Sequence, residues 1–143
     1  MKVEKKAVRS GILKLEKNVQ ITLDEDMNVP DTRPDVEKII ESRGEVHIDE
    51  IEVLTDRLRL RGNFLVQILY LSTDKEQQIS CMEHEFSIEE FMNVEGAESS
   101  DIAKVTADLE DLTISIINSR KCGVRSVIYF HIAISEMKFV ECT

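Results

Sequence analysis

The chain has 143 residues, enough to bury most of the surface of its unfolded form, so one domain can fold without disulfide or metal cross-links. Hydrophobic residues make up 42% and charged residues 32%, which excludes a disordered chain, and the lack of Trp leaves the core to Ile, Leu and Val, residues that favour strands. The formal net charge of −10 argues against nucleic acid and anionic membrane surfaces as partners, because an acidic body repels phosphate groups.

Positive charge is concentrated at the N-terminus. Residues 1–17 contain six basic and two acidic side chains and so carry +4, which leaves −14 on the other residues. We therefore expect a basic N-terminal arm over residues 1–17 and a single β domain over residues 18–143, with the arm attracted to the acidic body of another copy; a solvated terminus is the simpler alternative. The basic residues assigned to this assembly arm are Lys2, Lys5, Lys6 and Arg9.

The first element predicted along the chain is a strand, because apolar and polar residues alternate over residues 19–23. The stretch VPDTRPDVEKII follows and holds both prolines of the chain. After Pro34 the apolar residues recur at spacings typical of one helical face, and proline suits a first helical turn. We expect a short helix over about residues 34–42, ending near Gly44, with an apolar face formed by Val36, Ile39 and Ile40.

From Gly44 onwards the pattern changes to the alternation of strands. The step of three between Ile48 and Ile51 predicts a β-bulge near Asp49 and Glu50. The segments LRLRGNFLVQILYLS and KCGVRSVIYFHIAIS are the longest strand candidates. One face of each is apolar: Leu58, Leu60, Gly62, Phe64, Val66, Ile68 and Tyr70 in the first, and Val124, Ser126, Ile128, Phe130, Ile132 and Ile134 in the second.

The predicted fold class is therefore mainly β. Long strands, polar turns and one short helix are typical of an antiparallel β-sandwich or a partly open barrel.

The acidic residues of the proline stretch are the strongest candidates for chemistry. Asp31 and Asp35 could act as an acid–base pair or hold a cation, with a histidine as a third group. The prolines favour a structural interpretation, because each fixes its own backbone and restricts the residue before it, while an aspartate in a turn or a first helical turn accepts main-chain hydrogen bonds. We assign Pro30, Asp31, Pro34 and Asp35 to a structural hinge.

No other pattern in the sequence points to a reaction. Phosphate-binding loops, dinucleotide-binding loops and the common nucleophile and zinc motifs are absent, and His47, His84 and His131 lie in three different strand segments. We expect no enzyme activity, no cofactor and no metal.

The cysteines and the apolar segments indicate in which cellular compartment the protein is expected. Cys81, Cys122 and Cys142 form an odd set without metal-binding spacing, which indicates reduced cytosolic thiols, although Cys142 is well placed for an intersubunit disulfide. The basic start is not followed by the apolar segment of a signal peptide, and the run FLVQILYL is too short to span a membrane.

The proline stretch and the strands after it resemble the SPOCS domain, the spore coat structural domain of sporulation proteins from Clostridia and Bacilli. The resemblance lies in NVPDTRPDVEKIIESRGEVHIDEIEVLTDRLRLRGNFLVQILYLSTD, where a double Pro-Asp opening precedes a strand pair, and it extends over about Gly11 to Ser135. The matching residues are Pro30, Asp31, Pro34, Asp35, Val36 and Ile39, followed by Gly62, Ile68, Leu69 and Tyr70.

The resemblance implies a non-enzymatic structural protein of sporulation, present in the mother-cell cytoplasm and then in the spore coat or at the spore surface. The chain carries one copy of the domain and no LysM module, so a role that depends on LysM does not transfer. We expect it to assemble with itself, as an oligomer or filament, or to dock with other spore-coat proteins through strand edges and complementary charges. The alternative is a monomeric adaptor or ligand-binding β domain that recruits a basic protein partner.

Overall fold

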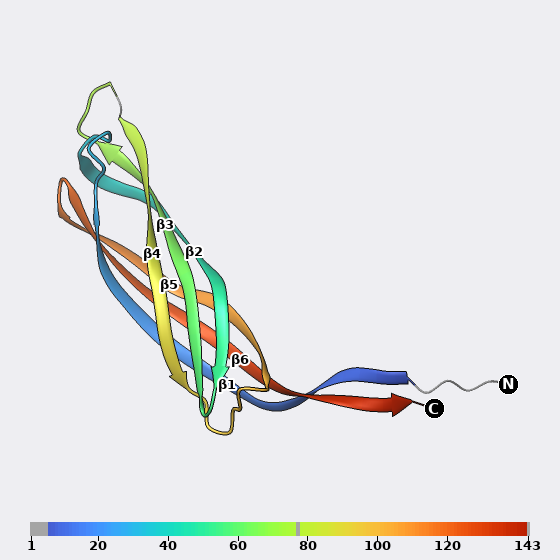
Figure 1. The fold of residues 1–143 in the computed structure, drawn as a ribbon. Coiled ribbons are helices and arrows are strands. Elements are labelled where there is room, and N and C mark those ends of the chain that lie inside the picture. The colour runs from blue at the N-terminus through green and yellow to red at the C-terminus, as the bar shows by residue number, and fades with distance from the viewer. Residues whose placement is uncertain (1–5, 77, 143) are drawn as a thin grey trace.

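The computed structural model describes residues 6–76 and 78–142, and their side chains from Ile12 to Glu136. Within these residues the fold is all-β and forms two three-stranded sheets (Figure 1). The strands are β1 (Lys6–Asn28), β2 (Val36–Leu54), β3 (Arg57–Ser72), β4 (Ile79–Asn93), β5 (Ile102–Asn118) and β6 (Lys121–Cys142).

The strand order is β1-β6-β5 in one sheet and β2-β3-β4 in the other, and every neighbouring pair is antiparallel. The first strand therefore pairs with the last, and β2 to β4 form a meander between them. The sheets do not share a strand pair, so they do not close into a barrel, although β2 lies against β5. The predicted fold class, an antiparallel β-sandwich of long strands, is confirmed.

The central strands β3 and β6 supply the middle of the core. Alternate residues of each strand are buried, as the sequence alternation predicts, while the residues between them point away from the other sheet. Each large apolar side chain buried in this way stabilises the fold by roughly 1.5–3 kcal/mol. The fully buried side chains include Leu58, Leu60, Phe64, Val66, Ile68 and Tyr70 on β3 and Val124, Ile128, Phe130, Ile132 and Ile134 on β6.

The predicted helix over residues 34–42 is wrong, because β2 occupies this segment from Val36. The pairing of β2 with β3 shifts register between Val36 and Lys38 and again between Ile39 and Glu41. Each shift inserts one residue into β2, so the next inward-facing position comes three residues on instead of two. The spacing that looks helical is that of a bulged strand. Ile40, an inserted residue, is 50% exposed.

The bulge predicted near Asp49 and Glu50 is confirmed by a third register shift, between Ile48 and Glu50. Gly62 lies opposite Ile48 at this place. A methyl group on Gly62 would overlap the carbonyl oxygen of His47, so the close approach of the two strands requires glycine.

Beyond the sandwich, β1 and β6 continue as a two-stranded ribbon (Figure 1). We use the term ribbon for residues 6–13 of β1 with residues 135–142 of β6. The third strand of the sheet, β5, begins at Ile102 opposite Ser135, and β1 has a register shift between Leu13 and Leu15. The division into an arm over residues 1–17 and a domain over residues 18–143 stays a prediction.

Candidate functional site

The proline stretch connects the two sheets, and the Arg120 side chain holds it in place. The stretch leaves β1, crosses to β2 and passes the turn between β5 and β6. The Arg120 guanidinium donates hydrogen bonds to the carbonyl oxygens of Val29, Pro30 and Arg33, at 3.2, 2.9 and 2.7 Å, and to Asp35 Oδ1 at 3.2 Å. A planar guanidinium can serve several acceptors at once, which a lysine ammonium cannot do with the same geometry.

Main-chain hydrogen bonds join the same two segments. The N–H of Val29 donates to the carbonyl of Arg120 at 2.9 Å, and the N–H of Val36 donates to that of Ser119 at 2.8 Å. On the other side, the Tyr70 hydroxyl donates to the carbonyl of Pro34 at 2.8 Å. The connection is therefore bonded to both sheets.

The structure gives the two aspartates different surroundings from those expected. Asp35 does not begin a helix but forms an ion pair with Arg120. The turn at Pro30 is closed by the main chain, with the N–H of Arg33 donating to the carbonyl of Pro30 at 2.9 Å, and the side chain of Asp31 is exposed. Sequence reasoning missed Arg120, whose only visible signal is a basic residue in the turn between the last two strands.

At the other end of the sandwich, the connection between β4 and β5 is bonded to β1. Lys14 forms an ion pair of 2.9 Å with Asp101, whose side chain is 2% exposed, and Lys17 Nζ donates to the carbonyl of Asn93. Asp101 also accepts the N–H of Glu98 at 2.9 Å. The hydrogen bond from Lys14 is the main reason that the pKa of Asp101 lies below its usual value, against the opposing effect of burial.

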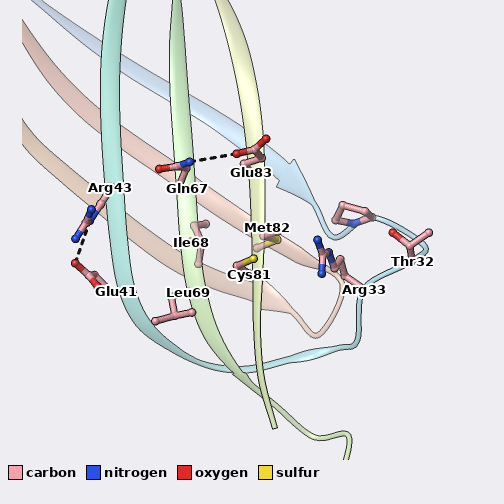
Figure 2. Close-up of a pocket in the computed structure, with 11 residues that line it drawn as sticks. Thr32, Arg33, Glu41, Arg43, Gln67, Ile68, Leu69, Cys81, Met82 and Glu83 are labelled. Atoms are coloured by element: carbon pink, nitrogen blue, oxygen red, sulfur yellow. Dashed lines mark hydrogen bonds and ion pairs between the residues drawn. The ribbon is translucent and has the colours of Figure 1, made fainter. Parts of the chain in front are cut away.

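A cleft of about 600 Å³ lies beside β2, β3 and β4 and reaches the proline stretch (Figure 2). Its polar side chains are bonded to each other: Arg43 Nε donates to Glu41 Oε1 and Gln67 Nε2 donates to Glu83 Oε2, each at 3.2 Å. The other lining residues are Pro30, Thr32, Arg33, Ile68, Leu69, Cys81 and Met82.

The three histidines are not brought together. His47 lies on β2, His84 on β4 and His131 on β6, where His131 Nδ1 contacts Asn18 Oδ1. Among the described residues, no group of three His, Cys, Asp or Glu side chains could hold a metal ion.

The cysteines differ in their access to solvent. Cys81 is exposed on β4, whereas Cys122 is buried in the core, and burial raises the pKa of its thiol. The side chain of Cys142 lies outside the described residues, so the predicted intersubunit disulfide stays a prediction. Of the assembly arm, Lys2 and Lys5 lie outside the described residues, while the main chain at Lys6 and Arg9 forms part of the ribbon.

No helix long and apolar enough to cross a membrane occurs in the described part of the chain.

A known protein family is similar to this chain. Residues 35–117, more than half of the chain, match the family model described as SipL, SPOCS domain. The match begins at Asp35 and takes in β2, β3, β4 and almost all of β5, so the first Pro-Asp pair precedes it. No curated protein and no solved structure matches the chain. The chain belongs to the SPOCS domain family, a family of sporulation-related proteins.

Proposed function

We propose that the protein is a non-enzymatic structural protein of sporulation that assembles with copies of itself, first in the mother-cell cytoplasm and then in the spore coat or a spore-surface structure. Membership of the SPOCS family supports the link to sporulation. The observation that supports assembly is the ribbon, which extends past the sandwich as only two strands (Figure 1).

An isolated two-stranded ribbon is marginally stable in water. Within the part of the chain that the structure describes, β1 is the edge strand of its sheet. The main-chain groups along such an edge are satisfied when another strand adds to the sheet. Ile12 and Leu13, where the ribbon meets the sandwich, are 46% and 56% exposed. Contact with a second copy would cover both features.

The test is the particle size of the purified full chain, measured by sedimentation with and without reductant. We expect particles heavier than the 16.4 kDa monomer, and monomers after deletion of residues 1–13. The deletion stops there because Lys14 pairs with Asp101 and Leu15 packs against the core.

A matched control removes the same net charge elsewhere. Replacing Lys75, Lys104 and Arg125, which are exposed on other parts of the surface, by Gln removes three positive charges, as the deletion does. The control should assemble like the wild type. A wild-type protein that is monomeric at tens of micromolar would instead favour the adaptor that recruits a basic partner. Heavy particles after the deletion would show that assembly does not need the ribbon.

A further inference from the structure

The two sheets have four edge strands, and two of them cover each other. β2 lies against β5, whereas β1 pairs only with β6, and β4 pairs only with β3. Over residues 6–76 and 78–142, no strand occupies the outer edge of β1 or of β4. These two edges are therefore open to a strand from elsewhere.

The edge strand β4 lacks most of the features that protect a sheet edge. Its 15 residues include no proline and no lysine, and it pairs with β3 without a register shift, while the pairing of β2 with β3 has three. Ile79 and Phe91, near its two ends, are 63% and 51% exposed. A long, regular edge of this kind is a template for another strand.

Charge selects which strand can add to β4. The strand carries four glutamates and no lysine or arginine, so pairing with β4 of another copy would place like charges opposite each other. Residues 6–17 of β1 carry four basic residues and one acidic residue. The glutamates of β4 are Glu83, Glu85, Glu89 and Glu90, and the basic residues of β1 are Lys6, Arg9, Lys14 and Lys17.

Two of these basic residues are engaged within the chain. Lys14 binds Asp101 and Lys17 binds the Asn93 carbonyl, and the other two, Lys6 and Arg9, lie on the β1 strand of the ribbon. The sequence of residues 6–13 is therefore basic and that of β4 is acidic, and within the described residues each of these strands pairs with one neighbour.

We propose that β4 is the acceptor edge for the ribbon of a second copy. Residues 6–13 of one copy pair with β4 of the next through main-chain hydrogen bonds, and the positive charge of residues 6–13, from Lys6 and Arg9, selects the acidic edge. This inference rests on the self-assembly proposed above and names its acceptor surface. Because the donor and acceptor edges differ, each added copy leaves one of each free, and the assembly grows as a filament unless its rotation closes a ring.

The test exchanges charges between the two edges of the full chain. Glu83→Lys with Glu85→Lys reverses the acceptor, Lys6→Glu with Arg9→Glu reverses the donor, and a fourfold variant combines both pairs. Asp108→Lys with Glu110→Lys is the matched control, because both residues are exposed on β5 and Glu110 accepts a hydrogen bond from Gln20 as Glu83 does from Gln67.

We expect each reversal alone to reduce the particles to the 16.4 kDa monomer, the fourfold variant to restore them, and the control to assemble normally. Circular dichroism identifies any variant that fails to fold, in which case the single variant Glu85→Lys, whose side chain is exposed, replaces the pair.

The outcomes separate this inference from the function on which it rests. A monomeric wild type contradicts both. If the wild type assembles, two results contradict the assignment of β4 alone. One is an unchanged particle size after reversal of Glu83 and Glu85, and the other is dissociation of the β5 control to the same extent.

Discussion

The proline stretch that connects β1 to β2 depends more on Arg120 than on any other described side chain. Arg120 donates to three carbonyl oxygens and to Asp35, and no other described side chain supplies these four acceptors. Arg120→Ala should lower the free energy of unfolding by about 2 kcal/mol, because hydrogen bonds that involve a charged group stabilise a protein by about 1.5–3 kcal/mol and this group is partly exposed. Urea unfolding measures the change.

The neighbouring residue provides the control for Arg120. Lys121 has the same 39% side-chain exposure but makes a single ion pair, of 3.3 Å, with Asp26. Lys121→Ala should cost less than about 1 kcal/mol, as exposed ion pairs usually do. Arg120→Lys should recover less than half of the loss. Equal losses for Arg120→Ala and Lys121→Ala would show that the connection does not depend on the guanidinium.

In the proline stretch, sequence reasoning identified the Pro-Asp residues but not the side chain that binds them. Restricted backbones at Pro30 and Pro34 follow from the residue type alone. The partner of Asp35 does not, because Arg120 lies 85 residues further along the chain and three of its four acceptors are main-chain carbonyls, which no sequence pattern marks.

The pairing of β2 with β3 depends on a glycine in β3. Gly62 of β3 faces the bulge at Asp49, where an added methyl group would meet the His47 carbonyl oxygen. Backbone atoms cannot rotate away, so Gly62→Ala must separate the strands, and we expect a loss of about 2–3 kcal/mol, as for overpacked cores. Thermal and urea unfolding measure the loss.

Gly123 on β6 is the matched glycine. A methyl group there would lie 2.8 Å from the Ser115 hydroxyl oxygen, which belongs to a side chain that can rotate. Gly123→Ala should therefore cost less than about 1 kcal/mol. If Gly62→Ala were as well tolerated, the close approach of β2 and β3 at the bulge would not be needed for stability.

The same element explains where prediction from sequence succeeded and where it failed. A step of three between apolar residues correctly indicated the bulge between Ile48 and Ile51, since regular alternation surrounds it. The step from Val36 to Ile39 has the same cause, but Ile40 follows and completes the spacing of a helical face. Periodicity alone cannot separate two closely spaced bulges from one turn of helix.

For the whole molecule, alternation predicted which faces of β3 and β6 are buried but not which strands pair. Each strand shows only that one of its faces is apolar, and that property is compatible with many strand orders. The pairing of β1 with β6 joins residues more than 90 apart over its whole length and depends on contacts between distant segments. The open edges of β1 and β4 follow from that order and could not be predicted without it.

The stability of the whole sandwich should depend on pH through Asp101, which joins the β4–β5 connection to β1. Its pKa is lowered in the folded protein, chiefly by the hydrogen bond from Lys14, so the folded state binds a proton less readily than the unfolded state. The resulting stabilisation is complete above the unfolded pKa, near 3.8, and is lost as the pH falls through the lower folded value. Asp101→Asn should thus be less stable than the wild type at pH 7, with the difference in unfolding free energy shrinking between about pH 5 and pH 2.

In Lys14→Gln the carboxylate loses this hydrogen bond, so the effect of Asp101→Asn should depend less on pH in that background. Urea unfolding of the four proteins across this range checks both statements. A difference between wild type and Asp101→Asn that stays constant from pH 7 to pH 2 would mean that the pair with Lys14 does not stabilise the fold through charge.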